Sequence, residues 1–416
     1  MFMRFYIILF AFVAMVSTQG KSQEIYSKLF TSVKENVYIE QSELRGKDIT
    51  PNCPVEWKIQ KYTLHGGKQE GVDVIEVDNG MLTFKVVPTR GMGILEVVCD
   101  DVRLGWDSPI KEVVHPMYID LERRSGSGML EGFNEFLMRC GIEFAGDPGT
   151  DTYLDFYEQE AELELTLHGK IQNTPASEVQ VLIEKEPPYR ISIRGKLNEC
   201  MFFGPQFELW TEISTEPGSL SFRVDDTITN HSVAEQEFQI IYHCNYGSSL
   251  VEAGSKFVAP LRQVTPANQI TVKRLDHITD YLGPSPDNSQ EEFNIQLWGD
   301  DKGLTQVMLH NEKVDRGVSM SFSIEQLPYF VLWKNMAPVE SGYVTGLEPA
   351  TGFAQNRRIQ RHFGRVPKLG AGESRRFTID FTFLNTKLDV KRIIDTIAGI
   401  QNGRKTRIDP QPEKRP

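Results

Sequence analysis

Short runs of alternating apolar and polar residues, separated by turn-forming residues, recur along most of this 416-residue chain. Such runs are typical of half-buried antiparallel strands, because successive side chains of a strand point to opposite faces. Examples are residues 72–77, 82–87, 161–167, 179–183, 190–194, 220–224 and 377–381. So many strands in one chain predict an all-β fold built as a sandwich or barrel.

Helical patterns are scarce outside this β-rich body. Residues 25–37 are expected to form a short helix, and residues 390–400 carry apolar side chains at helical spacing before Gly403. The stretch 403–416 is charged, contains proline and has no apolar face, so we expect it to be disordered. Large all-β folds can exceed ~250 residues as one unit, and we predict a single domain over residues 23–402.

The first 22 residues have the pattern of a secretion signal. Arg4 precedes an apolar run over residues 5–16, and small and polar residues follow at 17–20. The run is too short for a comfortable membrane span. We expect cleavage between Thr18 and Gln23 and a secreted or periplasmic protein that no longer contacts the membrane. An uncleaved anchor and a mis-assigned start remain the alternatives.

The charge and the cysteines exclude several classes of function. A net charge of -12 disfavours polyanionic partners, so nucleic acid and anionic membranes are not expected. The five cysteines are widely spread and include no Cys-x-x-Cys pair, which argues against a structural zinc site. We expect neither a metal nor a cofactor, and most cysteines to be buried free thiols, although an oxidising compartment permits one or two disulfides.

A glycine-rich segment over residues 126–149 differs in texture from the strands around it. Six glycines flank a brief apolar helical turn around residues 133–138, and the segment also carries Arg139 and several carboxylates. Loops of this kind often border binding sites, because glycine permits close backbone approaches. The alternative is a tight crossover between strands.

Two short segments carry the groups best suited to proton transfer. His243 follows the apolar strand pattern of residues 238–241, and Glu348 stands in the sequence Gly-Leu-Glu-Pro-Ala-Thr-Gly over residues 346–352. An imidazole and a carboxylate from distant strands that face each other across a cleft can act as general acid and base. We expect the two groups to favour each other's charged forms.

These motifs resemble those of the aldose 1-epimerases, in the galactose mutarotase-like superfamily. The chain is most similar to a bacterial branch described only as a domain of unknown function. The shared landmarks are residues 89–94 (TRGMGI), 132–141 (GFNEFLMRCG), 167–176 (LHGKIQNTPA), 333–335 (WKN) and 342–349 (GYVTGLEP). The resemblance covers roughly residues 70–385 and implies a β-supersandwich of large antiparallel sheets with few short helices.

The resemblance also implies roles for individual residues. Glu348 would be the general base at the anomeric hydroxyl and His243 the proton donor to the ring oxygen. His168 and Arg139 would hold sugar hydroxyls, with Arg90 as a second cationic candidate. The family's further acidic residue corresponds to Asp287, Glu291 or Glu292, of which we take Glu292. The aromatic candidates for stacking on a pyranose are Trp333, Trp210, Trp298 and Tyr343.

Three functions are compatible with these features. The first is a mutarotase-type enzyme that interconverts the anomers of a small-molecule sugar by acid–base catalysis without a cofactor. The second is a non-catalytic carbohydrate-binding protein on the same scaffold, and the third is a relative of polysaccharide lyases or hydrolases. The arginines at 357, 358 and 361 form a basic cluster that is either solvated or a contact for an acidic sugar. No oligomeric state follows from the sequence.

Overall fold

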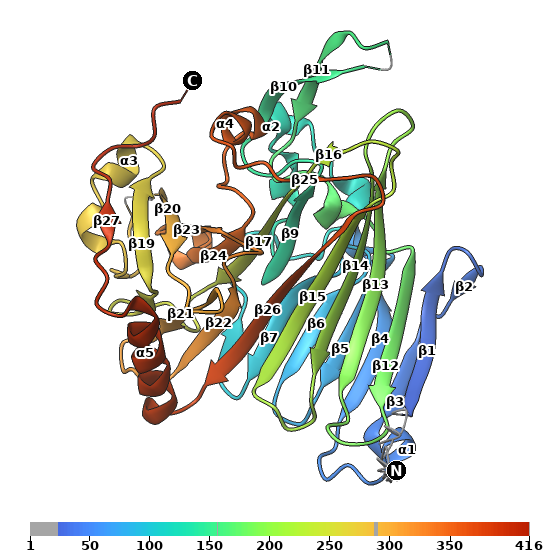
Figure 1. Ribbon diagram of the computed structural model, residues 1–416. Coiled ribbons are helices and arrows are strands. Elements are labelled where there is room, and N and C mark those ends of the chain that lie inside the picture. The colour runs from blue at the N-terminus through green and yellow to red at the C-terminus, as the bar shows by residue number, and fades with distance from the viewer. Residues whose placement is uncertain (1–23, 156, 287–289, 416) are drawn as a thin grey trace, which may run out of the picture.

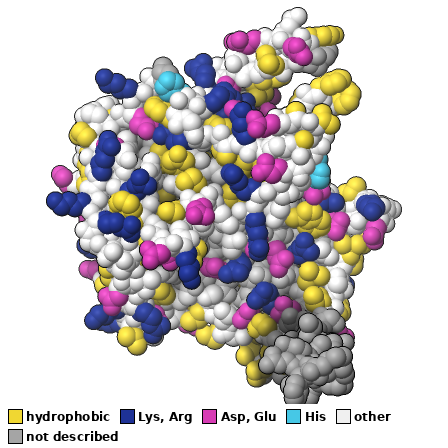
Figure 2. All heavy atoms as spheres, in the orientation of Figure 1, with side chains coloured by type: hydrophobic (Ala, Val, Ile, Leu, Met, Phe, Trp, Pro, Cys, Tyr) yellow, Lys and Arg dark blue, Asp and Glu magenta, His cyan; other side chains and the backbone are white. Residues whose placement is uncertain are grey.

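The computed structural model describes residues 24–155, 157–286 and 290–415 (Figure 1). The predicted signal segment, residues 1–22, and Asp287 lie outside the described residues. Within the described part of the chain, no helix is both long and apolar enough to cross a membrane. On the face shown in Figure 2, acidic and basic side chains stand next to one another without an extended basic patch.

Two large sheets form the molecule, which confirms the predicted all-β fold. The first, in spatial order, consists of β18 (Lys256–Val258), β21 (Leu304–His310), β22 (Gly317–Ser323), β26 (Ser374–Leu384), β15 (Ser221–Asn230), β14 (Gln206–Thr215), β13 (Ile191–Cys200), β12 (Glu178–Glu184), β1 (Ile25–Ser32) and β2 (Val37–Tyr38). The second consists of β27 (Arg407–Ile408), β19 (Leu261–Pro266), β20 (Gln290–Leu297), β23 (Tyr329–Asn335), β24 (Val344–Ala350), β17 (Gln239–Tyr246), β9 (Leu137–Ile142), β7 (Gly93–Cys99), β6 (Thr83–Val87), β5 (Val72–Asp78), β4 (Lys58–Leu64) and β3 (Ser42–Arg45), with β8 (Val102–Leu104) beside β7.

The remaining elements are short. Two small ladders join β10 (Gly149–Leu154) to β11 (Glu160–Leu165) and β16 (Gln236–Glu237) to β25 (Lys368–Leu369). The α-helices are α1 (Gly46–Ile49), α2 (Arg123–Gly126), α3 (Gln269–Val272), α4 (Arg357–His362) and α5 (Lys387–Gln401). The 3-10 turns are Gly67–Gln69, Pro116–Tyr118, Gly128–Glu131, Ile171–Asn173, Leu275–His277 and Val339–Ser341.

The main core lies between the two large sheets, which face each other in Figure 1. Strands such as β12 and β14 alternate buried and part-exposed side chains, as the period-two pattern predicts. Phe222 of β15 stacks on Phe381 of β26 with 4.6 Å between ring centroids, and Phe136 packs edge-on against both. Burial of these rings from both sheets fixes the sheets against one another.

The helix predicted for residues 25–37 is wrong. These residues form β1 and β2, and β1 pairs antiparallel with β12. Over so short a stretch, the spacing of the apolar residues is compatible with a helix or with a strand. The segment forms a strand because it pairs with the free edge of β12. The helix predicted at residues 390–400 is confirmed as α5, which is capped at its start by Thr386.

Residues 404–415 are folded onto the protein, which differs from the predicted disordered tail. Strand β27 pairs with β19 in a parallel ladder, and Asp409 accepts hydrogen bonds from Gln263 and Thr265 at 2.6 and 2.7 Å. Composition indicated disorder because the segment has no apolar face. Backbone pairing and charged contacts hold it instead, and neither can be read from composition.

Candidate active site

One pocket of about 380 Å³ lies over the middle of the second large sheet. Its size falls in the ~300–1,000 Å³ range typical of small-molecule sites. Its floor is a band of side chains across five neighbouring strands, β20, β23, β24, β17 and β9. The cross-strand neighbours in this band are Gln290 and Asn335, Glu292 and Trp333, Val331 and Glu348, and His243 and Met138.

Strand alternation explains why these residues share one face. On β17, Tyr242, Cys244 and Tyr246 point into the core between the sheets, so His243 points to the pocket. Both faces of β17, β9 and β24 are buried, because the glycine-rich segment covers the pocket side. That segment supplies Met129, Leu130 and Phe133 to the pocket wall, which confirms that it borders the site.

His243 and Glu348 meet directly at the pocket floor. The register of β17 and β24 pairs Ile241 with Ala350 and Cys244 with Leu347, which places the two side chains opposite each other. His243 Nε2 lies 3.2 Å from Glu348 Oε1, and the side chains are only 6% and 2% exposed. The meeting of imidazole and carboxylate predicted from the sequence is therefore present.

Gly346 makes room for this pair. A Cβ atom at this position would lie 2.5 Å from Glu348 Oε1 and 3.1 Å from His243 Cε1. Any side chain here would therefore displace one of the two groups. The Gly-Leu-Glu motif thus supplies both the carboxylate and the space that the carboxylate needs.

Burial shifts the pKa values of both members of the pair. Burial lowers the pKa of His243 well below its ordinary value, and the neighbouring His168 lowers it further. Burial likewise raises the pKa of Glu348 well above its ordinary value, and Glu292 adds to this shift. Both shifts favour the uncharged form of the group, which is the opposite of the direction expected from mutual attraction.

His168 lies beside the pair, in the turn after β11. Its ring packs edge-on against His243 with 5.5 Å between centroids, and burial lowers its pKa to about 4. Its Nδ1 atom is buried without a partner among the described residues, as is Glu348 Oε2. Since buried polar atoms nearly always have partners, these two atoms are available to a ligand.

Aromatic rings surround His243. Phe133 and Trp333 pack edge-on against it at 5.3 and 5.6 Å, and Trp106 packs against Phe133 at 5.1 Å. Trp333 is thus a pocket residue, as predicted. Trp106 and Phe133 were not predicted, although an aromatic residue between Gly105 and Asp107 in a turn is a signal that could have pointed to Trp106.

Two further carboxyl groups line the pocket, Glu292 and Asp147. Burial raises the pKa of Glu292 to about 8, Asp147 adds to this shift and Arg415 opposes it. Burial also raises the pKa of Asp147, and Arg415 again acts in the opposite direction. Glu291, the other described candidate, does not line the pocket and forms ion pairs with Lys334 and Arg274. Asp147 was missed because it stands in a glycine-rich loop among several other carboxylates.

Arg139 does not reach the pocket, so its expected contact with a sugar is wrong. It follows pocket-lining Met138 on β9 and therefore points into the core between the sheets. There its Nε and Nη2 atoms donate to Asp226 of β15 at 2.5 and 3.0 Å, and Tyr242 donates to the same carboxylate at 2.9 Å. Arg139 joins the two sheets instead.

Arg90 is also placed away from the sugar pocket. It is fully buried, forms an ion pair with Glu135 at 2.7 Å, and donates to the carbonyl oxygens of Gly132 and Val114 at 2.8 and 3.2 Å. Gly132 and Glu135 flank the segment that carries Phe133, a wall of the pocket. Arg90 therefore supports the glycine-rich segment rather than a ligand.

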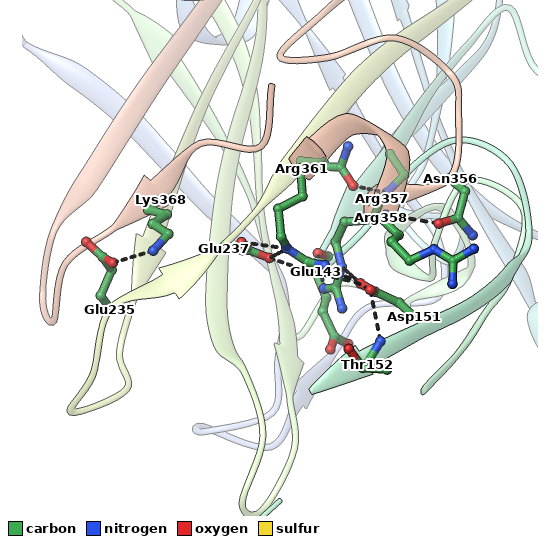
Figure 3. A network of polar contacts seen from close by, with 12 residues as sticks. Glu143, Asp151, Thr152, Glu235, Glu237, Asn356, Arg357, Arg358, Arg361 and Lys368 are labelled. Atoms are coloured by element: carbon green, nitrogen blue, oxygen red, sulfur yellow. Dashed lines mark hydrogen bonds and ion pairs between the residues drawn. The ribbon is translucent and has the colours of Figure 1, made fainter. Parts of the chain in front are cut away.

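The basic cluster on α4 is mostly sequestered (Figure 3). Arg357 donates to Asp151 at 2.7 Å, and Arg361 donates to both oxygens of Asp151 and to Glu237 at 2.7 to 3.0 Å. Arg358 is the exposed member of the three. Arg357 and Arg361 thus hold the β10–β11 hairpin and β16 to α4. The sequence left two interpretations open for these arginines, solvation and contact with an acidic sugar, and neither describes their position.

The other polar and aromatic candidates have structural surroundings. Trp210 lies under Arg194 and Lys196, Trp298 packs against Arg262 and Arg404, and Tyr343 is buried.

All five cysteines are free thiols, three of them buried. Among the described residues, no group of three or more His, Cys, Asp or Glu side chains is arranged to hold a metal ion.

Two facing sheets, with a histidine–glutamate pair in a pocket over one of them, give the chain a galactose mutarotase-like fold. The chain belongs to the family described as Domain of unknown function (DUF4432), which matches residues 69–383. No curated protein matches the chain.

Solved structures agree with this assignment. A proposed aldose 1-epimerase from Klebsiella pneumoniae subsp. pneumoniae is 36% identical with a TM-score of 0.89, covering 94% of this chain and 100% of that one. A galactose mutarotase-like protein from Clostridium acetobutylicum is 13% identical with a TM-score of 0.53, covering 79% and 98%. A galactose mutarotase related enzyme from Lactobacillus acidophilus is 14% identical with a TM-score of 0.52, covering 75% and 98%. The last two are similar in fold alone.

Proposed function

We propose that the protein is a mutarotase-type enzyme, which interconverts the anomers of a free aldose by general acid–base catalysis. The observation that carries this proposal is the contact of His243 Nε2 with Glu348 Oε1 at 3.2 Å on the floor of the pocket. Mutarotation needs a base at the anomeric hydroxyl and an acid at the ring oxygen. Because both oxygens are bonded to one carbon, two side chains in contact can serve both.

Ring opening follows from this arrangement. The carboxylate of Glu348 takes the proton of the anomeric hydroxyl, and the oxygen that loses it forms the carbonyl double bond. The bond from the anomeric carbon to the ring oxygen breaks, and its electron pair stays on the ring oxygen, which takes the proton of the His243 imidazolium. Rotation about the bond between the first two carbons and reversal of these transfers give the other anomer.

The histidine–glutamate pair can hold the single proton that this cycle needs in either of two forms. A protonated Glu348 with a neutral His243 carries one proton, as does an ionised Glu348 with an imidazolium. The first form is also the state left after ring opening. A bound sugar that accepts from His243 and donates to Glu348 stabilises the ionised form, so the proton has only to shift across the contact.

The rest of the pocket suits a pyranose. Trp333 and Trp106 offer flat apolar surfaces, and His168, Asn335 and Glu292 offer polar groups for hydroxyls. The resemblance to proteins described as aldose 1-epimerases and galactose mutarotase-like proteins supports sugars as the substrate class.

Polarimetry tests the proposal directly. Freshly dissolved α-D-galactose and α-D-glucose should equilibrate faster with the protein than in buffer. Glu348→Gln should lower the catalysed rate by ~10²-fold or more, because the amide keeps the shape but cannot accept the proton. The matched control is Glu325→Gln, which changes an exposed carboxylate outside the pocket and should leave the rate unchanged.

Other outcomes would replace the proposal. If sugars bind but a broad panel of aldoses equilibrates at the buffer rate, the protein is a binding module on this scaffold. If a polysaccharide is cleaved instead, it is a lyase or hydrolase. We also propose export through the signal at residues 1–22, and the intact mass of the protein from its native compartment tests this.

A further inference from the structure

We infer that the sugar pocket selects an aldose that carries a protonated amino group, and that the carboxyl groups of Asp147 and Glu292 bind this ammonium. The inference rests on the proposed function of the pocket and names the class of its substrate. Neutral aldoses, which have the same anomeric centre, are expected to bind more weakly.

Three carboxyl groups from separate parts of the chain line one pocket. Asp147 comes from the glycine-rich segment, Glu292 from β20 and Glu348 from β24. Among the described residues, no lysine or arginine lines the pocket. Its two histidines, His168 and His243, do not supply a fixed positive charge either, because burial lowers the pKa of both. The lining therefore offers negative groups to a ligand and no permanent cation.

The carboxyl groups also lack partners of their own. Neither Asp147 nor Glu292 forms a side-chain hydrogen bond or an ion pair with a described residue, and the charge of Arg415 acts on both only from beyond ion-pair distance. Deeper in the pocket, Glu348 is 1% exposed and its Oε2 atom is buried without a partner in the described part of the chain. Buried carboxylates are normally paired, so these oxygens indicate a ligand that donates. An ammonium offers three donors and a positive charge at one atom.

Close packing holds Asp147 at the pocket. The preceding Gly146 has a φ of +87°, and a Cβ atom there would lie 2.5 Å from the carbonyl oxygen of Gln355. The carbonyl oxygen of Gly146 also accepts a hydrogen bond from the backbone amide of His168 at 2.9 Å. The loop is thus fixed between the His168 turn and the segment after β24, and both border the pocket.

Backbone contacts likewise fix Glu292. Its amide donates to Thr271 Oγ1 at 3.1 Å, and its carbonyl oxygen accepts from the amide of Ala267 at 2.9 Å. In the sheet it lies opposite Trp333, whose ring is another wall of the pocket. The strand therefore presents the Glu292 carboxyl beside the Trp333 ring.

The lysine next to Trp333 does not neutralise this carboxyl. Lys334 follows Trp333 on β23 and so points to the opposite face of the sheet. There its Nζ atom donates to the carbonyl oxygens of His277 and Asp280 at 3.0 and 2.9 Å. The described residues around the pocket thus leave the place of a cation to the ligand.

The sheet sets where the amino group lies on the sugar. Glu292 and Glu348 are on strands separated by β23, and neighbouring strands are ~4.8 Å apart, so the two backbones lie roughly 10 Å apart across the sheet. With the anomeric carbon at the His243–Glu348 pair, an amino group at C3 or C4, on the far side of the ring, is the one that reaches Glu292 and Asp147.

The charge of the ligand then changes the charge of the pocket. Burial raises the pKa of Asp147 and raises that of Glu292 to about 8. An ammonium beside these groups favours the ionised carboxylates and lowers both pKa values, so binding should release protons. A hydroxyl group has no such effect, and a sugar phosphate would be repelled.

Calorimetry tests the preference by comparing 3-amino-3-deoxy-D-glucose with D-glucose on the wild-type protein at pH 6.5, where the sugar amine is charged. The amino sugar should bind about tenfold more tightly or better, because it adds a charge pair inside the pocket. Its binding should also release about one proton, which is measured by repeating the titration in buffers of different ionisation enthalpy.

Two substitutions test the named carboxyls. Glu292→Gln and Asp147→Asn keep the shape but remove the charge, and each should lower the ratio of the two affinities by about threefold or more. The matched control is Glu340→Gln, which removes an exposed carboxylate next to pocket-lining Ser341 and should leave the ratio within about twofold. Equal affinities of the wild type for the two sugars, a ratio that survives in both pocket variants, or an equal loss in Glu340→Gln would overturn the inference.

The outcome is separate from that of the proposed function. Calorimetry needs no turnover, whereas polarimetry follows it. A preference for the amino sugar without catalysed mutarotation would refute the proposed function alone. Mutarotation of D-glucose without this preference would refute the inference alone.

Discussion

At the scale of single residues, the central finding is the contact of two almost fully buried groups, the His243 imidazole and the Glu348 carboxyl. The sequence placed an imidazole and a carboxylate in one site, and simple attraction between them predicted two charges. Burial opposes that attraction, because it lowers the pKa of His243 and raises the pKa of Glu348. No sequence motif reports how deeply a strand end is covered, so the effect of burial on these pKa values could not be predicted from the sequence.

The first prediction at this scale concerns Gly346. Gly346→Ala should lower the rate of mutarotation by about tenfold or more, because the new Cβ would lie 2.5 Å from Glu348 Oε1 and must push the carboxylate out of line. Polarimetry measures the rate, and circular dichroism checks that the fold is retained.

Gly370→Ala is the matched control for this change. Its Cβ would meet only Glu373 Oε2, at 3.4 Å, well away from the pocket. Equal rates for Gly346→Ala and Gly370→Ala would mean that the pair tolerates displacement, and the close fit at Gly346 would then have no catalytic meaning.

At the scale of elements, period-two patterns predicted most strands because one face of each is solvated. The central strands β17, β9 and β24 lack that signal, since both of their faces are buried. The strand pattern therefore could not correct the pocket position that the family resemblance implies for Arg139. On a strand that is covered on both faces, the alternation of apolar and polar residues does not show on which face a lone arginine lies. The position of Asp226 in the other sheet shows that Arg139 lies on the core face.

A second prediction concerns the contact of the β10–β11 hairpin with α4 (Figure 3). Hydrogen bonds from Arg361 and Arg357 lower the pKa of Asp151 from 3.8 to about 2, although burial opposes the shift. The shift corresponds to ~2 kcal/mol of stability at neutral pH. Asp151→Asn should lower the free energy of unfolding by about that amount, as measured with urea.

The sign of the pH dependence follows from the depressed pKa. The contribution is fully present above the unfolded value of 3.8 and is lost as the pH falls toward about 2. The difference between the wild type and Asp151→Asn should therefore shrink over that window. The control is Asp380→Asn, which breaks an ion pair with Arg223. The two side chains are 47% and 42% exposed, so this change should lower the free energy of unfolding much less. A constant difference down to pH 2 would contradict the assignment.

At the scale of the whole molecule, the pocket exists because segments distant in sequence converge on one sheet. The His243 and Glu348 motifs were recognisable because each is compact in sequence. Asp147 and Trp106 were not, because each joins the site only through the path of its loop. The same topology gives the second large sheet one face toward the pocket and one toward the core. An ion pair between the two sheets stabilises the core face.

The last prediction tests that separation through Arg139 and Asp226. Arg139→Met should lower the free energy of unfolding by ~3–5 kcal/mol, because it leaves the buried Asp226 without its partner. Asp226→Asn should also destabilise, and the double variant should lose less than the sum, since the residues are in direct contact. Urea unfolding measures all three.

Kinetics of the same variants distinguish the two assignments of Arg139. Because its side chain points away from the pocket, Arg139→Met should keep the wild-type KM for D-galactose per folded molecule. His168→Asn, which alters a pocket residue, is the comparison and should raise the KM. A raised KM in Arg139→Met, with stability little changed, would return this arginine to the role that the family resemblance implies and would contradict its place between the sheets.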